Sequence, residues 1–243
     1  MKKRIIVGVL ILILVGFLFI LQSPKNSTIY KQEVTDSLIK KEATTKRNDI
    51  LSLQETYQNQ DIIGELFLDD LGIDALITKT NDNSYYLNHD IYQKESKLGN
   101  PYIDFRNSNN LENEKQINIY SHNSDYEEYK EELPFNKLEH YLEKDKFENS
   151  GIIELQTKNS LMKYEVIAIK IITTDNEHTI LDSESEERWN LHLTKLLENT
   201  KYCKEDCKLT KEDQLLILQT CNYKPKDSYI LLISKKINKE VIT

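Results

Sequence analysis

The chain has 243 residues, a formal net charge of −8, five histidines and three cysteines. Three cations stand at its N-terminus, so the remainder of the chain is more acidic still. An acidic surface repels a phosphate backbone, which argues against nucleic acid as a partner. The length and the 39% hydrophobic content suit one domain with a core of its own.

The N-terminal segment reads as a membrane anchor. Met1-Lys2-Lys3-Arg4 precedes an apolar run from Ile5 to Leu21 that contains no charge. Such a run predicts one membrane-spanning helix, and the cations before it place the N-terminus in the cytoplasm. A cleaved signal peptide begins in the same way, but the residues after Leu21 lack the small-residue pattern of a cleavage site. We therefore predict a single-pass anchor in the cell membrane over residues 1–22, with the rest of the chain extracellular.

Residues 23–60 are polar and charged, with apolar positions spaced by three and four. This spacing is typical of amphipathic helices. We predict a helical extension or linker that packs against the next domain or spaces it from the membrane.

From Asp61 onward the pattern changes to short strands, which we expect at 62–68, 73–77, 101–105, 116–121, 151–157, 161–173, 214–221 and 228–237. One helix is predicted over residues 184–197, where Trp189 and Leu193 lie on one face. Many short strands with few helices favour a mainly β domain over residues 61–243, built as a closed or partly closed β-barrel.

Cys203 and Cys207 stand four residues apart. Outside the cell they can form a local disulfide, and two surface thiols are the alternative. Half of a metal site is a third interpretation, but a metal needs two more ligands, and the sequence offers no Cys-x-x-Cys or His pair to supply them. We predict no metal.

Two apolar runs are each followed by a residue that can take part in catalysis. Leu215 to Gln219 leads into Thr220 and Cys221, and Asn118 to Tyr120 leads into His122. A thiol needs a base or imidazolium partner, which is usually distant in sequence. The pair therefore suggests a thiol enzyme built on a sheet, although a free cysteine is also often a buried core residue. The remaining histidines are expected at the surface: His89, His140, His178 and His192.

Four segments, taken in chain order, resemble motifs of the class B sortases, which are membrane-anchored cysteine transpeptidases of Gram-positive cell surfaces. Asp82–Leu87 resembles the family's Asp-Asn-x-x-Tyr-Leu, and Ile103–Asn107 resembles its Asp-Tyr-Arg-Asn. Ile119–Asn123 resembles Tyr-Gly-His-Asn, and Leu218–Cys221 resembles Leu-x-Thr-Cys. The resemblance covers roughly residues 61 to 238.

The resemblance implies an eight-stranded sortase-type barrel with flanking helices, an N-terminal helical extension and no cofactor. It implies that Cys221 attacks a Thr carbonyl in the C-terminal sorting signal of a secreted protein and forms a thioester. An amine of the cell wall or of a pilus subunit then resolves that thioester. His122 would protonate the leaving amine, and Thr220 would line the substrate groove.

The chain departs from the family at two positions, of which the milder is Ser121 in place of the usual glycine before the histidine. Sortases carry an arginine at the start of the strand after the cysteine, where this chain has Tyr229, and no arginine occurs in the sequence after Arg188. A tyrosine donates one hydrogen bond without charge, while Lys224 or Lys226 in the preceding loop would bring a point charge. Losing an oxyanion donor costs about 10² to 10³ in rate. Three alternatives stay open: an active transpeptidase, a sortase-like protein that only binds peptides, and a secreted thiol hydrolase outside the family.

Overall fold

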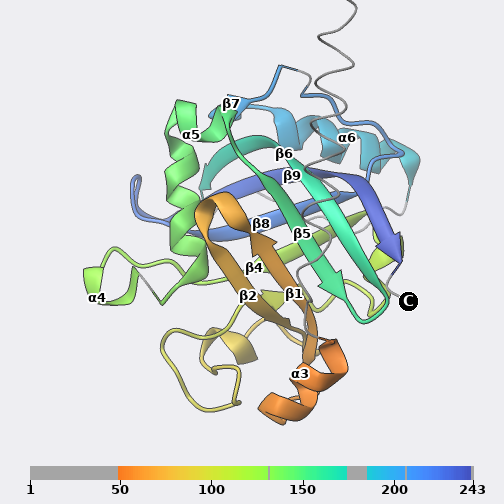
Figure 1. Cartoon of the computed structure of the whole chain (residues 1–243). Coiled ribbons are helices and arrows are strands. Elements are labelled where there is room, and N and C mark those ends of the chain that lie inside the picture. Colours follow the sequence, from red (N-terminus) through yellow and green to blue (C-terminus); the bar gives the residue numbers. More distant parts are fainter. Residues whose placement is uncertain (1–48, 131, 174–184, 206, 242–243) are drawn as a thin grey trace, which may run out of the picture. The chain divides into compact units, whose positions relative to one another are not determined.

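The computed structural model describes residues 49–130, 132–173, 185–205 and 207–241 (Figure 1). The predicted anchor over residues 1–22 and most of the predicted extension over 23–60 lie outside the described residues. All described residues belong to one compact unit, Asn48–Thr243. None of the helices within these described ranges combines the length and the apolarity needed to cross a bilayer.

The described residues fold around a closed β-barrel. Its strands are β1 (Ile62–Leu68), β2 (Ile73–Thr78), β3 (Tyr102–Ile103), β4 (Gln116–Tyr120), β5 (Ile152–Thr157), β6 (Ser160–Thr173), β8 (Leu215–Asn222) and β9 (Ser228–Val241). Neighbouring strands are arranged in the order β5-β1-β2-β3-β4-β8-β9-β6, and β5 also pairs with β6, which closes the ring. The short strand β7 (Tyr202–Cys203) pairs with β6 outside that ring. The eight-stranded barrel is therefore confirmed, and closure pairs each of its strands on both sides.

Each strand position predicted from the sequence carries a strand. The strand β3 is shorter than its predicted range, and β9 is longer because it pairs with β6 along most of its length. The two-residue strand β7 was not predicted, since so short a segment has no alternation to detect. Two pairings are parallel, β2 with β3 and β4 with β8, and the others are antiparallel.

The strand β8 is apolar on both faces, and the two faces have different neighbours. Leu216 and Leu218 belong to an interior cluster that fills the barrel, whereas Leu215 and Ile217 belong to an outer cluster beneath α6 (Glu186–Leu197). Side chains alternate between the two faces of a strand, so even-numbered residues of β8 point inward and odd-numbered residues point outward.

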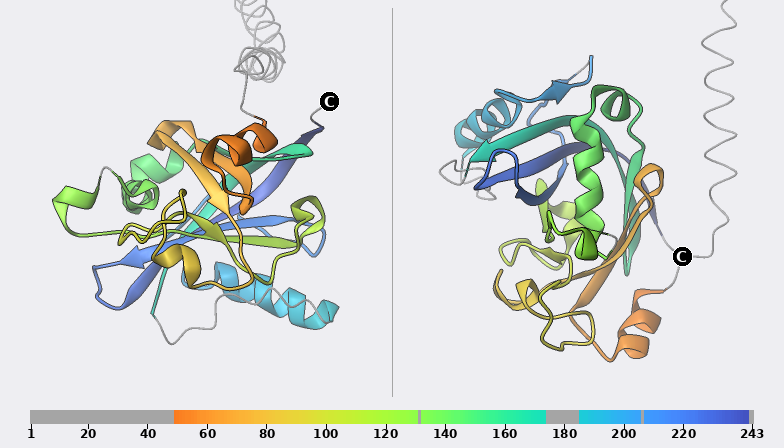
Figure 2. Two further views of the ribbon diagram at one scale, coloured as in Figure 1. Left: turned by 90° about the horizontal axis from the view of Figure 1, so that it is seen from below. Right: turned by 90° about the vertical axis from the view of Figure 1, so that its left-hand side faces the viewer.

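Two helices flank the barrel on opposite sides (Figure 2). The helix α3 (Ile50–Tyr57) begins at Asp49, whose carboxylate accepts the Leu51 N–H, and it packs Ile50 and Leu53 against Ile62. It forms the described end of the predicted helical extension. On the other side, α6 confirms the predicted helix before the cysteine strand and begins at Ser185, whose hydroxyl accepts the Arg188 N–H.

His192 lies in the apolar stripe of α6, so the expectation of a surface residue was wrong. Its side chain is buried, three residues after Trp189 and one before Leu193, and its Nε2 lies 2.6 Å from Gln116 Oε1. Burial lowers the pKa of His192 to about 4, so the ring is neutral near physiological pH.

Shorter helical segments connect the strands: η1 (Asp69–Leu71), η2 (Tyr85–Leu87), η3 (Leu111–Asn113), α4 (Glu127–Lys130), η4 (Pro134–Leu142) and α5 (Lys144–Glu148). The segment η4 contributes Phe135, Leu138 and Tyr141 to the interior cluster. Its Tyr141 hydroxyl also donates to Asp70 at 2.6 Å, which ties η4 to the β1–β2 turn.

Cys203 and Cys207 form a local disulfide that spans the end of β7 and the loop after it. The half metal site considered from the sequence is therefore wrong, because both sulfurs are used in the bond. Cys207 packs against the outer cluster beneath α6.

Candidate active site

The ends of β4 and β8 bring the predicted cysteine and histidine to one edge of the sheet. These parallel strands pair residue by residue up to Tyr120 opposite Gln219. The Ser121 N–H then donates to the Gln219 carbonyl at 3.2 Å, which continues the ladder past the end of β4. Because the strands are parallel, Cys221 and His122 each come two residues after this last pair.

Cys221 and His122 also fall on the same face. Cys221 shares the outer face of β8 with Ile217, since Leu216 and Leu218 point into the barrel. On β4 the inward residues include Ile119, so continued alternation places His122 on the outer face as well. The structure thus brings together two residues that are 99 positions apart in the sequence.

Three hydrogen bonds hold these strand ends together. The Thr220 hydroxyl donates to the Ser121 carbonyl at 2.8 Å, and Asn123 Nδ2 donates to the Cys221 carbonyl at 2.9 Å. The Tyr223 hydroxyl donates to the Asn123 carbonyl at 2.8 Å. The backbone on both sides of the cysteine is therefore fixed relative to the chain that carries the histidine.

Thr220 was predicted to line the substrate groove. Its side chain is buried, and alternation places it on the face opposite Cys221. With its hydroxyl bonded to Ser121, Thr220 ties the two strands together in this structure.

The histidine ring is held by a loop that sequence reasoning missed. His122 Nε2 lies 2.8 Å from the Leu87 carbonyl. A carbonyl only accepts, so Nε2 carries a proton and Nδ1 is the nitrogen free to exchange one. Gly99 packs against this ring with φ +61°, and a Cβ there would lie 3.2 Å from His122 Cδ2 and 2.4 Å from the Tyr86 carbonyl. Only glycine permits this approach, so the glycine itself is the sequence signal for this loop.

Cys221 is a half-buried free thiol. Burial raises the pKa of the Cys221 thiol above its ordinary value, because a thiolate is disfavoured away from water. The thiol is therefore protonated near neutral pH, and its attack on a substrate needs a proton acceptor such as His122.

Tyr229 lies directly opposite Cys221 in the antiparallel pair of β8 and β9. Residues opposite each other project from the same face, so the Tyr229 side chain lies on the face of the sheet that carries the thiol. Lys224 and Lys226 lie in the connecting loop and are exposed. The Asn222 side chain donates to the Lys224 carbonyl at 2.9 Å, which ties the loop back to β8.

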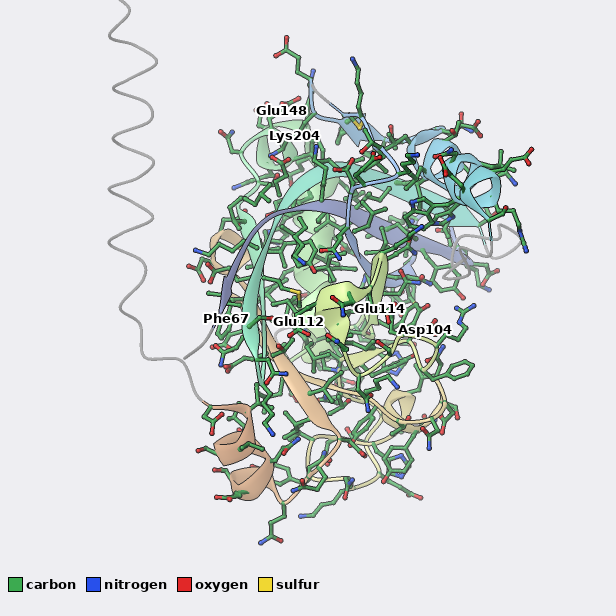
Figure 3. The ribbon with its side chains drawn as sticks, turned by 90° about the vertical axis from the view of Figure 1, so that its right-hand side faces the viewer. Phe67, Asp104, Glu112, Glu114, Glu148 and Lys204 are labelled. Atoms are coloured by element: carbon green, nitrogen blue, oxygen red, sulfur yellow. A yellow bond between two sulfur atoms is a disulfide. The ribbon has the colours of Figure 1, made fainter. Side chains whose placement is uncertain are left out.

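A second group that sequence reasoning did not assign adjoins the site. Tyr102 on β3 stands opposite Tyr120 on β4, with ring centroids 5.4 Å apart. The Tyr120 hydroxyl donates to Asp104 at 2.7 Å, and Arg106 donates to both oxygens of that carboxylate, at 2.9 Å and 2.7 Å. Asp104 is labelled in Figure 3. Burial favours the neutral acid, but the hydrogen bonds from Arg106 and Tyr120 outweigh it and lower the pKa of Asp104. Burial and then the nearby charges of Asp104 and Cys221 raise the pKa of Tyr102.

Comparison with known proteins identifies the architecture. No protein-family profile matches the chain. The chain is 28% identical over 178 residues to sortase B of Listeria monocytogenes, which covers 72% of this chain and 68% of that protein. The fold matches Clostridium perfringens sortase B with a TM-score of 0.69 at 19% identity, over 76% of this chain and all of that one. It matches a Staphylococcus aureus sortase B–substrate complex with a TM-score of 0.69 at 24% identity, over 86% and 94% of the two chains.

The closed barrel, together with the cysteine and histidine on paired strand ends, defines a sortase-type cysteine transpeptidase. The Listeria monocytogenes relative is a sortase B, which supports the resemblance to class B that the four motifs carry. The comparisons lend no support to a protein that only binds peptides or to a thiol hydrolase outside the family.

The raised pKa of Cys221 gives a direct test of the site. The rate of Cys221 alkylation by iodoacetamide should increase with pH, with a midpoint above the ordinary cysteine value of about 8.5, because only the thiolate reacts. Mass spectrometry of the non-reduced protein monitors the reaction, and Cys221→Ala should show none. A midpoint near or below neutral pH would show that the thiol is stabilised as a thiolate, contrary to this site.

Proposed function

We propose that Cys221 cleaves the C-terminal sorting signal of a secreted protein and that an amine of the cell wall or of a pilus subunit receives the new C-terminus. The observation that carries this proposal is the meeting of Cys221 and His122 at the paired ends of β4 and β8. One structural relative, the Staphylococcus aureus sortase B, has been solved with a substrate, which supports a peptide substrate here.

The reaction needs one nucleophile and one proton carrier. The Cys221 sulfur attacks the carbonyl carbon while His122 Nδ1 accepts the thiol proton. The protonated His122 then gives that proton to the departing amine, and the C–N bond breaks to leave a thioester on Cys221. An incoming amine attacks the thioester, His122 takes its extra proton and returns it to the sulfur, and a new amide is released. The Leu87 carbonyl, which accepts from Nε2, stabilises the ring while it is positively charged.

We assign the oxyanion of each tetrahedral intermediate to the neighbourhood of Tyr229. Its register position opposite Cys221, on the same face of the sheet, supports this assignment, because an oxyanion donor has to lie beside the nucleophile. A phenol supplies one hydrogen bond and no charge, so this chain stabilises the oxyanion less than an arginine does.

We propose that the run Ile5 to Leu21 anchors the enzyme to the membrane, with the barrel on the outer side. The three preceding cations support this orientation. Membrane fractionation with N-terminal sequencing checks it, and a mature N-terminus near Ser23 in the culture medium would contradict it.

The proposed thioester can be detected by intact mass. Incubation with a library of sorting peptides should produce an acyl adduct in the wild-type protein and none in Cys221→Ala. His122→Ala should slow adduct formation by about 10² to 10⁴, the usual contribution of a general acid–base. Changing Cys203 and Cys207 together to serine serves as the control and should leave turnover largely intact. An adduct on Cys221→Ala, or equal loss in the double variant, would contradict this assignment of the nucleophile.

The oxyanion assignment has its own test. Tyr229→Arg should raise the single-turnover acylation rate, by up to about 10²-fold, because it restores a charged donor. Lys224→Ala and Lys226→Ala are the matched comparisons: a loss of rate there, with little gain from Tyr229→Arg, would move the role to the loop lysines. Normal sortase rates that respond to none of the three changes would show that the site needs no cation at this place.

A further inference from the structure

The strand β3 is so short that β2 stays largely unpaired along one edge. On one side β2 pairs with β1 from Ile73 to Thr78, but on the other it meets β3 only where Thr78 stands opposite Tyr102. Neighbouring strands lie about 4.8 Å apart, so β2 and the end of β4 are separated by roughly two spacings where β3 is missing. A cavity of about 300 Å³ lies there, lined by β2, by residues 98–101, by Ser121 and by the start of η4.

Backbone groups of β2 face this cavity. Alternate residues of an antiparallel strand direct their N–H and C=O groups to opposite sides. The Gly72 carbonyl accepts from Lys137 Nζ at 2.6 Å. The Leu76 carbonyl accepts from Asn100 Nδ2 at 3.1 Å, so the even-numbered residues face away from β1. The Asp74 N–H and C=O and the Leu76 N–H therefore point toward the cavity, and none of the three has a hydrogen-bond partner among the described residues.

The opposite wall of the cavity carries a hydroxyl in the same condition. Ser121 is 8% exposed and lines the cavity. Its backbone is engaged with β8, since its N–H donates to Gln219 and its C=O accepts from Thr220. Its hydroxyl makes no hydrogen bond to any residue that the structure describes. A buried hydroxyl without a partner loses the hydrogen bonds it would make to water, so a polar ligand in the cavity would restore them.

The cavity also adjoins the proposed proton carrier. Ser121 directly precedes His122, and Gly99, another lining residue, packs against the His122 ring. The charged side chains among the described lining residues are Asp74, Glu132 and Lys137, which give two carboxylates and one ammonium. A net negative site favours a cationic ligand. In the proposed reaction the incoming amine passes its proton to His122, so the acceptor has to approach this histidine.

We propose that this cavity binds the acceptor as one additional strand. A short, extended cell-wall peptide with a free amine pairs with the β2 edge at Asp74 and Leu76 and bonds the Ser121 hydroxyl. The volume is at the low end for ligand pockets, which suits a few residues of peptide rather than a folded pilus subunit.

The amine of this peptide reaches past His122 to the thioester. The cavity lies on the side of β4 that faces away from β8, so the amine extends beyond it by roughly 10 Å, or about three residues. There the amine nitrogen forms the new C–N bond as the C–S bond breaks, and its proton passes through His122 to the sulfur. The inference rests on the proposed function, because it names the acceptor of the thioester on Cys221.

The edge pairing is tested on the full chain, acylated at Cys221 by a sorting peptide and then mixed with an amine. Tetraglycine is long enough to pair with β2, whereas hydroxylamine is too small. Asp74→Pro removes the edge N–H, at a position where proline leaves the pairing with β1 in place. It should slow resolution of the thioester by tetraglycine about fivefold to tenfold, the worth of roughly one hydrogen bond, and leave hydroxylamine unaffected. Intact mass against time gives both rates.

Asp74→Asn is the matched control for that variant. It keeps the N–H and the shape of the side chain and removes only the charge. Its rate with tetraglycine should stay within about threefold of the wild-type rate, and the difference should vanish at high salt, because salt screens exposed charges.

Two further changes do not depend on the folding of the proline variant. Tetraglycine methylated at one internal nitrogen loses an N–H that can pair with the Asp74 carbonyl. At one internal position this should slow its reaction with the wild-type thioester about fivefold to tenfold. Ser121→Ala removes only the hydroxyl and should slow tetraglycine about twofold to fivefold, with the hydroxylamine rate unchanged.

Two results would overturn the inference. One is that tetraglycine and hydroxylamine respond alike to Asp74→Pro and Ser121→Ala while every methylated tetraglycine reacts as fast as tetraglycine itself. The other is that a folded domain displaying a lysine resolves the thioester and tetraglycine does not. In both cases the thioester still forms, so the proposed function stands. If no sorting peptide acylates Cys221, the proposed function fails and this inference fails with it.

Discussion

The active site depends on one constraint, the parallel pairing of β4 and β8. Beyond the last paired residues, the Asn123 side chain links the same two chain segments by a hydrogen bond. Asn123 is buried, and its Nδ2 donates both to the Cys221 carbonyl at 2.9 Å and to Glu139 of η4 at 2.7 Å. One amide thus joins the backbone of the nucleophile to the chain that carries His122 and to η4. Neither strand is at an edge, since β3 and β9 flank them, so the closed barrel holds this pairing rigid.

The same framework provides a site with little positive charge. The charge of Arg106 is matched by Asp104, and the residue opposite the thiol is an uncharged tyrosine, Tyr229. Burial keeps the Cys221 thiol protonated near neutral pH, so we propose that its activation rests on His122. The Leu87 carbonyl binds Nε2 of that histidine and Gly99 packs against its ring, so Nδ1 is the nitrogen left for proton transfer.

Local pattern was enough to predict the strands and the helix α6, and four short motifs pointed to Cys221 and His122, the pair that we propose for catalysis. Local pattern did not predict which strands pair with each other, because nothing in the spacing of Ser121 and Thr220 indicates that their strands are neighbours. Both faces of β8 are covered, so its sequence is apolar throughout and does not show which residues face outward. The burial of His192 follows from its place in the apolar stripe of α6, whereas the residue type alone favours the surface. The Leu87 carbonyl could not be foreseen, as a backbone atom carries no sequence signature.

The most direct test of the role of Asn123 measures single-turnover acylation of Cys221 in Asn123→Ala and Asn123→Asp, with iodoacetamide alkylation of the same proteins as the reference. Aspartate keeps the shape of the side chain but cannot donate to the Cys221 carbonyl. We expect acylation to fall roughly tenfold to a hundredfold in both variants, because misplacement of the reacting groups is costly. Alkylation, which needs only the thiol, should be unchanged. Acylation at the wild-type rate in both variants would contradict the claim that Asn123 sets the geometry of the site.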